Sequence, residues 1–198
     1  MYIPKHFEQN DRTSTIAFMQ NFNFALLVSV KDTIPVATHL PFVIEERDHD
    51  IVLISHMSKA NDQWRTAKVK EVLVVFSEPH AYISPSHYEK QQNVPTWNYV
   101  AVHAYGKISV LEDDNQKLEV LHKQMRSFEE AYLQQFNTLD QKYIDGLLKG
   151  IVAFEILVTD LQSKAKLSQN KTLSEREKIK QELEQSNDTI KQSLGKMM

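Results

Sequence analysis

The chain has 198 residues, enough for one substantial domain with an appendage or for two very small domains. Hydrophobic residues make up 41% and charged residues 25%, which excludes a largely disordered chain. No apolar run approaches the roughly 20 residues that cross a bilayer, and the start of the chain lacks the apolar core of a signal peptide. We therefore expect a cytoplasmic protein without membrane contact. The absence of cysteine excludes disulfides, thiolate nucleophiles and cysteine-ligated metals.

The net charge of -3 is unevenly distributed. Residues 163–198 hold eight Lys or Arg against five Asp or Glu, so this tail is basic and the rest of the chain is acidic. A nucleic-acid binder usually presents a concentrated basic face, because neutralising phosphates dominates its affinity. Charge alone therefore does not favour DNA binding.

The first half of the chain predicts a short helix followed by β-hairpins. Asn10 or Asp11 can cap a helix that runs to about Asn21, because an Asx oxygen accepts the free N–H groups of the first turn. Pro41 lacks an N–H, so its strand should be an edge strand or be bulged there. Apolar runs predict strands over 24–30, 35–44 and 51–57, and a short helix should follow over 60–68.

The second half continues with strands and then changes period. Strands are expected over 71–77, 80–84 and 97–111, followed at the end of this region by a strand over 151–158. Another short helix is expected over 140–148, ended by Gly150. Between these elements, apolar residues at steps of three and four predict one helix whose buried face holds Leu118, Leu121, Met125, Phe128 and Tyr132.

The tail predicts an amphipathic helix. Ser174 and Glu177 match a capping box, and a narrow apolar stripe follows at Ile179, Leu183, Ile190 and Leu194. A stripe this thin needs a partner, so the helix docks on its own domain, pairs with a second chain or frays, in that order of preference. We divide the chain into a domain over 1–162 and a C-terminal turn and helix over 163–198.

Hairpins without regular strand–helix alternation predict a mainly β protein with peripheral helices (α+β), built on a small antiparallel barrel. Four glycines in the whole chain exclude a GxGxxG fingerprint and a P-loop. The eight histidines form no HExxH pair and no GxSxG elbow is present, so we predict neither a metal site nor a catalytic side chain. His39 and His56 lie beside small hydroxyl residues, and they are either ordinary strand histidines or binding residues.

Six segments carry a resemblance to a known family. They are MYIPKHF, ATHLP, the HxxxANxQW segment that starts at His56, YISPSxY, VPTWNY and KLSQNK, in this order between Met1 and Lys171. The chain resembles the PaiB family of FMN-binding split-barrel proteins, which are described as negative transcriptional regulators. The resemblance implies a six-stranded antiparallel split β-barrel related to the pyridoxamine-phosphate oxidase group. It also implies a homodimer with FMN in a cleft between the subunits.

The resemblance implies which residues bind FMN. A phosphate needs cationic or hydroxyl donors, so we expect it at Ser58 and Lys59, before a helix that starts near Ala60, with Asn61 and Arg65 assisting. The flavin's polar edge and ribityl chain need further donors and acceptors. The full set of predicted cofactor-binding residues is Thr38, His39, Leu40, His56, Ser58, Lys59, Asn61, Trp97 and Asn98.

Two members of this set, Trp97 and Asn98, are expected from the second subunit, and the turn over 166–170 is expected to close the cleft. Trp97 fits a core position equally well, whereas Trp64 fits a core anchor better than a cofactor contact. A buried amide such as Asn98 must find partners for up to four hydrogen bonds, so it has less reason to be structural.

The resemblance leaves more than one function open. The first hypothesis is an FMN-binding dimer that acts as a negative transcriptional regulator, with any DNA contact supplied by the basic tail. The alternative is a flavin-dependent oxidoreductase or a haem-degrading enzyme on the same fold, in which the cofactor carries the chemistry and no catalytic motif need occur. A third option is a module that only sequesters or senses flavin.

Overall fold

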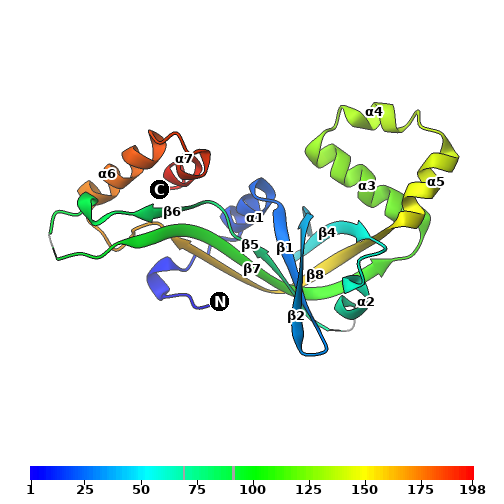
Figure 1. Ribbon diagram of the computed structural model, residues 1–198, viewed down its shortest axis with the longest axis horizontal. Coiled ribbons are helices and arrows are strands. Elements are labelled where there is room, and N and C mark those ends of the chain that lie inside the picture. The colour runs from blue at the N-terminus through cyan, green and yellow to red at the C-terminus, as the bar shows by residue number, and fades with distance from the viewer. Residues whose placement is uncertain (69, 91) are drawn as a thin grey trace. The chain divides into compact units, whose positions relative to one another are not determined.

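The computed structural model describes residues 1–68, 70–90 and 92–198 (Figure 1). The chain forms two compact units. The barrel unit comprises 16–75 and 104–161, and the terminal unit comprises 1–15, 76–103 and 162–198. In chain order the elements are η1 (Lys5–Phe7), α1 (Arg12–Asn21), β1 (Phe24–Lys31), β2 (Ile34–Pro41), β3 (Val43–Arg47), β4 (Asp50–Ser58), α2 (Gln63–Ala67), β5 (Val72–Phe76), β6 (His80–Ile83), η2 (Pro85–His87), β7 (Thr96–Leu111), α3 (Asp114–Phe128), α4 (Tyr132–Phe136), α5 (Gln141–Gly150), β8 (Ile151–Lys166), α6 (Leu173–Glu184) and α7 (Thr189–Gly195).

One sheet builds the barrel unit, in the order β2-β1-β5-β7-β8-β4-β3. The β1–β2, β1–β5, β3–β4 and β4–β8 pairs are antiparallel. The two ends of the sheet curl towards each other, so that β2 contacts β4 without forming a ladder with it. The Ser55 hydroxyl donates a hydrogen bond to the Pro41 carbonyl across this seam at 2.7 Å. The mainly β class and the antiparallel split barrel are confirmed, with eight strands in the described residues where six were expected.

The β1–β2 hairpin follows from its sequence. Asp32 and Thr33 adopt positive φ angles of 47° and 69°, which reverse the chain between the strands. Pro41 ends β2, because it has no N–H to donate to a neighbouring strand. Phe42 belongs to neither strand, and β3 begins at Val43. The single strand expected over 35–44 is therefore two strands in two hairpins. The Phe42 side chain is fully buried, with its ring 6.5 Å from that of Phe154.

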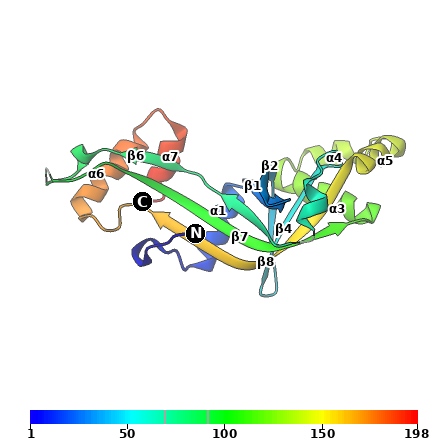
Figure 2. The same ribbon diagram turned by 60° about the horizontal axis from the view of Figure 1, so that its bottom comes forward.

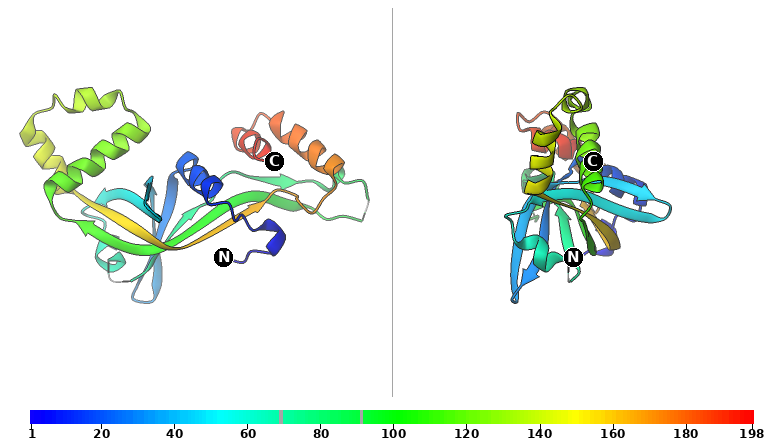
Figure 3. Two further views of the ribbon diagram at one scale, coloured as in Figure 1. Left: turned by 180° about the vertical axis from the view of Figure 1, so that it is seen from behind. Right: turned by 90° about the vertical axis from the view of Figure 1, so that its right-hand side faces the viewer.

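Helices α3, α4 and α5 gather over one end of the barrel unit (Figure 3). Asp113 caps α3 by accepting hydrogen bonds from the Asn115 and Gln116 backbone N–H groups. Four of the five residues predicted for one helix face belong to α3, which ends at Phe128. The fifth, Tyr132, begins the separate helix α4. A cluster of α5 and α4 side chains, Phe136, Ile144 and Leu148, packs on the apolar face of α3.

The terminal unit joins both ends of the chain. Strand β6 pairs with β7, and an isolated bridge joins Glu8 to Lys164 in β8. Figure 2 shows α6 and α7 side by side next to β6. The β8 strand continues to Lys166, eight residues past its expected end at Val158, because polar residues near its end are buried against the first residues of the chain.

The tail forms two helices where one was expected. The capping box consists of Thr172 and Glu175, whose side chain and backbone groups bond reciprocally, and the proposed Ser174–Glu177 box was wrong by two residues. Three residues of the predicted apolar stripe, Ile179, Leu183 and Leu194, are buried. In this structure α7 contacts β6 and α6 contacts η2 of the same chain.

Candidate functional site

Two of the motif segments meet in the barrel unit. The Asn61 side-chain amide donates a hydrogen bond to the Thr38 hydroxyl at 2.9 Å, and that hydroxyl donates to the side-chain carbonyl of Gln63. Thr38 belongs to β2, whereas Asn61 and Gln63 belong to the turn after β4 and to α2. We call the residues Thr38, Ser58, Lys59, Asn61 and Gln63 the β2–α2 corner. The structure thus brings together Thr38 and Asn61, which are 23 residues apart in the sequence.

Gln63 is the anchor of this corner, and the sequence prediction did not select it. Its side chain is 2% exposed, and its amide nitrogen lies 3.1 Å from each of three acceptors, the Leu27 carbonyl, the Ser29 hydroxyl and the Val36 carbonyl. These contacts fix α2 on the β1–β2 hairpin. The signal was present in the sequence, because a polar residue beside Trp64 in a short amphipathic helix must be satisfied if it points inward.

Trp64, by contrast, is only half-buried. The Arg65 guanidinium carbon and the Lys68 ammonium nitrogen lie 5.2 and 5.4 Å from its ring centroid, so the ring carries cations on its surface. The expectation that Trp64 is the core anchor of this helix is therefore wrong, and Gln63 has that role.

Lys59 and Ser58 lie in an exposed turn that has a defined backbone. The Asn61 N–H donates to the Ser58 carbonyl at 2.9 Å, the Lys59 N–H donates to the Gly150 carbonyl at 2.9 Å, and the Ala60 N–H donates to the Ser58 hydroxyl at 3.3 Å. Helix α2 begins at Gln63, three residues later than expected, because the Asn61 side chain accepts the Gln63 N–H and holds the intervening residues in a turn.

The Lys59 ammonium forms no ion pair with any residue that the structure describes, whereas Arg65 pairs with Asp62 at 3.4 Å. A lysine and a serine hydroxyl on a fixed exposed turn are donors suited to a phosphate group. The side chains present at the corner therefore fit the phosphate end of a nucleotide.

The other two predicted residues of β2 point in different directions. Leu40 is buried, with 7% of its side chain exposed, and it contributes to the barrel core. His39 is exposed, and its ring stacks on that of Phe24 with centroids 5.9 Å apart and an interplanar angle of 23°. Phe24 is itself 66% exposed. His39 therefore borders an uncovered apolar surface of the sheet.

His56 lies under α3. Its Nδ1 atom is 2.6 Å from the Gln124 side-chain oxygen, and Gln124 also donates to the Pro41 carbonyl at 3.4 Å. Burial lowers the pKa of His56 below its usual value near 6.5, and the hydrogen bond that the ring N–H donates to the Gln124 oxygen partly opposes this effect. His56 is therefore neutral at physiological pH, with a partner inside the chain.

Trp97 and Asn98 belong to the terminal unit. Trp97 is 51% exposed and stands beside His80 and Tyr82, with ring centroids 5.5 and 6.2 Å away, so a core role for Trp97 is excluded. Asn98 is fully buried, and it both donates to and accepts from the Ser168 hydroxyl, at 2.9 and 3.2 Å. The structure thus gives Asn98 a structural partner in the KLSQNK segment, and its contact with a cofactor remains a prediction.

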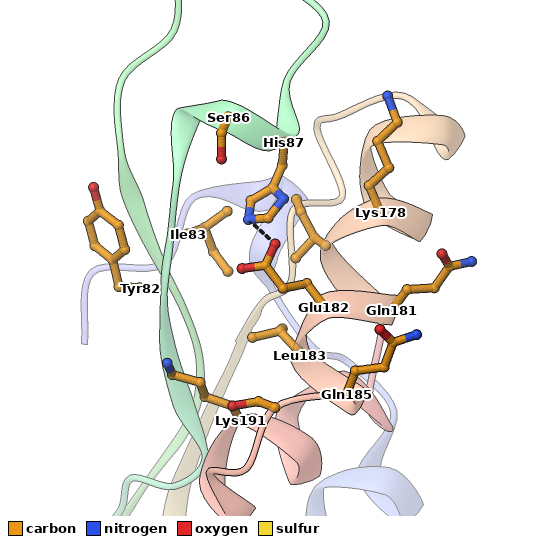
Figure 4. A pocket seen from close by; sticks show the side chains of 12 residues that line it. Tyr82, Ile83, Ser86, His87, Lys178, Gln181, Glu182, Leu183, Gln185 and Lys191 are labelled. Atoms are coloured by element: carbon orange, nitrogen blue, oxygen red, sulfur yellow. Dashed lines mark ion pairs between the residues drawn. The ribbon is translucent and has the colours of Figure 1, made fainter.

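The terminal unit also carries a surface groove of about 640 Å³ between β6, η2 and helices α6 and α7 (Figure 4). In it, the His87 imidazole faces Glu182, with Nε2 3.3 Å from the carboxylate oxygen. Lys178, Gln181, Gln185 and Lys191 give its walls a polar character. None of the predicted cofactor residues lines this groove.

The described residues, that is, the chain without positions 69 and 91, lack two further features. They hold no group of three or more His, Asp or Glu side chains arranged to bind a metal ion. No helix among them has the length and apolar character needed to span a membrane.

The chain is similar in sequence to a protein family and to individual known proteins. Residues 1–160 match the family described as "Putative FMN-binding domain". The chain is 37% identical to the protease synthase and sporulation protein PAI 2 of Bacillus subtilis, over 100% of this chain and 96% of that protein. It is also 34% identical to the uncharacterized yeast protein YKL070W, over 58% of this chain and 81% of that one.

Solved structures share the fold. The flavocytochrome Anf3 from Azotobacter vinelandii matches with a TM-score of 0.64 and 14% identity, over 83% of this chain and 72% of that one. The FAD and haem binding protein from Mycobacterium smegmatis matches with a TM-score of 0.62 and 16% identity, over 80% and 73% of the two chains. These similarities and the motifs above lead to one conclusion: the chain belongs to the FMN-binding domain family, has the PaiB-like split-barrel fold, and has FMN as its cofactor.

Proposed function

We propose that the β2–α2 corner binds the phosphate and ribityl end of FMN. One observation carries this assignment. The hydrogen bonds among Thr38, Asn61 and Gln63 fix a short turn on which the Lys59 ammonium has no acidic partner in the described part of the chain. Lys59 and Ser58 donate to the phosphate, and Thr38 and Asn61 supply polar atoms for the ribityl chain. When bound, FMN supplies redox chemistry and a visible chromophore.

The exposed apolar face of the β1–β2 hairpin, opposite the face on which Thr38 contacts Gln63, supports the position of the flavin ring. Alternation along β1 places Phe24, Leu26, Val28 and Val30 on one face, and all four are half-exposed or exposed. In the β1–β5 register Leu26 lies opposite Val75, so the apolar surface continues onto β5. We propose that a second copy of the chain covers this face in a homodimer and that the flavin ring is held against it, near His39.

The phosphate assignment is tested by Lys59→Ala. A hydrogen bond to a charged group contributes about 1.5 to 3 kcal/mol, so FMN affinity should fall by about 10- to 150-fold in a fluorescence titration. Lys142→Gln is the matched control, because Lys142 is exposed on α5 in the same unit. FMN affinity that is unchanged in Lys59→Ala moves the phosphate site away from the corner.

Val28→Glu tests the dimer. A carboxylate in the centre of the apolar face should shift the sedimentation coefficient from dimer to monomer and weaken FMN binding. A wild-type monomer that binds FMN with full affinity contradicts the proposed arrangement.

We further propose that the protein is a negative transcriptional regulator. The name of the Bacillus subtilis relative connects that protein with protease synthesis and sporulation, which supports a role in controlling gene expression. Any DNA contact should involve exposed cations of the tail, such as Lys178 and Lys196. Removing the tail is a poor test, because Ile179, Leu183 and Leu194 belong to the core.

A double substitution, Lys178→Gln with Lys196→Gln, keeps those core residues. Each lost phosphate contact should reduce the slope of log binding constant against log salt concentration by about 0.9. DNA binding with an unchanged salt slope contradicts this surface. Bleaching of the bound flavin by NADH or NADPH, without any DNA binding, would instead identify the protein as an oxidoreductase.

A further inference from the structure

A second, smaller cavity lies in the terminal unit. It has a volume of about 230 Å³, and its walls include Phe7, Tyr88, Thr96, Lys166, Ser168 and Lys171. We call it the lysine pocket. At about 30 Å³ for each water, this volume equals roughly eight water molecules. It is smaller than the roughly 300–1,000 Å³ of sites for drug-sized ligands, so it suits a small molecule and not a flavin nucleotide.

The lysine pocket is cationic. Both lysines have only neutral hydrogen-bond partners in it, because Lys166 donates to the Thr96 hydroxyl and Lys171 donates to the Asn93 side-chain oxygen at 2.8 Å. None of the side chains that line it is acidic. Glu175 interacts electrostatically with Lys171, and its carboxylate accepts the Glu89 and Thr172 backbone N–H groups in its capping position.

Each ammonium has three N–H donors, and one hydrogen bond uses only one of them. Both lysines therefore retain donors for a negatively charged group, while the carboxylate of Glu175 is occupied by backbone N–H groups.

The Tyr88 hydroxyl is the second, independent observation. Tyr88 is 8% exposed, and its hydroxyl oxygen is buried without a hydrogen-bond partner among the residues that the structure describes. An unpaired buried hydroxyl destabilises the folded state, so such groups are rare unless something else binds them. Burial, followed by the negative charge of Glu175, raises the pKa of Tyr88, and the hydroxyl therefore remains a donor at neutral pH.

Two aromatic rings lie beside the ammonium groups of Lys166 and Lys171. The Lys171 ammonium nitrogen lies 3.9 Å from the centroid of the Tyr88 ring, and the Lys166 ammonium nitrogen lies 5.9 Å from that of Phe7. The rings hold the ammonium groups in place without neutralising their charge. The same rings offer an apolar wall to the body of a ligand.

We propose that the lysine pocket binds a small organic molecule through one oxyanion group, a carboxylate or a phosphate, which accepts hydrogen bonds from Tyr88, Lys166 and Lys171. The lining residues of this site belong to the terminal unit and include Asn98, whereas the β2–α2 corner proposed for the FMN phosphate belongs to the barrel unit. The proposal therefore does not depend on the assignment of the FMN phosphate to that corner.

Calorimetric titrations of the full chain with inorganic phosphate and with benzoate, at low ionic strength and pH 7.5, test the proposal. We expect one molecule of at least one probe to bind per chain. Preference for benzoate identifies a carboxylate site with an apolar wall, and preference for phosphate identifies a phosphate site. Lack of binding of both probes up to about 10 mM, an affinity limit near 3 kcal/mol, overturns the proposal.

Tyr88→Phe gives the sharpest result, because it removes only the unpartnered hydroxyl. Affinity for the probe should fall by about 10-fold while the melting temperature stays the same or rises. Lys171→Gln should also weaken binding by about 10-fold or more. The matched controls are Tyr143→Phe and Lys142→Gln, since both residues are exposed on α5.

FMN affinity should be unchanged in Tyr88→Phe and Lys171→Gln, which distinguishes a failure of this site from a failure of the flavin site. Equal probe affinity in Tyr88→Phe and the wild type contradicts the assignment. A lower melting temperature of Tyr88→Phe contradicts it too, since the hydroxyl would then have a partner in the folded chain.

Discussion

Replacing Gln63 with Met tests whether one buried amide holds the β2–α2 corner together. The substitution keeps the length of the side chain and removes its polar atoms. The amide has two hydrogens and three acceptors at 3.1 Å, and its oxygen accepts from the Thr38 hydroxyl. At any moment three hydrogen bonds are therefore formed. At about 1 kcal/mol each, Gln63→Met should lower the free energy of unfolding by about 3 kcal/mol.

Urea denaturation monitored by circular dichroism measures the change in the free energy of unfolding, and thermal denaturation measures the change in melting temperature. For a chain of this size about 1 kcal/mol corresponds to about 2–4 °C, so the melting temperature should fall by roughly 6–12 °C. The control is Gln134→Met on α4, where the side chain is exposed, and its effect should stay within about 0.5 kcal/mol.

FMN affinity provides a second measurement on the same variant. It should fall in Gln63→Met because Thr38 and Asn61 lose the group that orients them. A free energy of unfolding within about 0.5 kcal/mol of the wild type would refute the view that Gln63 anchors α2.

Three further predictions concern the barrel core, pH and the tail. Gly106→Ala should destabilise the fold by about 1–3 kcal/mol, because a Cβ there would lie 2.5 Å from the Leu157 carbonyl oxygen, whereas Gly146→Ala meets nothing within 4 Å and should stabilise α5 by about 0.5–1 kcal/mol. Burial lowers the pKa of His56, so as pH falls below about 6.5 the unfolded chain takes up a proton before the folded chain does. The free energy of unfolding should therefore fall as pH is lowered from 6.5, and it should fall less steeply in His56→Gln. An equal slope in the wild type and in His56→Gln would contradict this. Thr172→Ala removes the cap of α6 and should cost about 1 kcal/mol in thermal unfolding, and a gain in stability would show that the capping box is not formed.

The strands of the barrel were predictable because their signals are local. Apolar runs with strand period predicted β1, β4, β5, β6 and β7 to within one or two residues at each end. The end of β8 was not predictable in this way. Its last residues are polar, and Lys164 is buried only because its ammonium donates to the Tyr2 carbonyl at 3.2 Å and faces the rings of Tyr2 and Tyr99. Such contacts join distant parts of the sequence, which a local pattern does not report.

The start of α2 and the set of residues at the site also depend on contacts that a local sequence pattern does not report. The helix after β4 was expected from Ala60, but the Asn61 side chain satisfies the Gln63 N–H and delays it. The structure brings Thr38 of one motif segment into hydrogen-bond contact with Asn61 of another, and their binding of a cofactor stays a prediction. The roles of Gln63 and Tyr88 depend on which neighbours surround a buried polar atom, and the sequence alone does not contain that information.

The two ends of the sheet bear on how copies of this chain can associate. Strand β2 ends the strand order on one side and carries Pro35 and Pro41, which have no backbone N–H to offer to another strand. Strand β3 ends it on the other side and closes with the charged residues Glu45, Glu46 and Arg47. Both borders therefore resist strand addition, the route by which β-proteins grow into fibres. The homodimer proposed above would therefore use a broad surface and not these two strand edges.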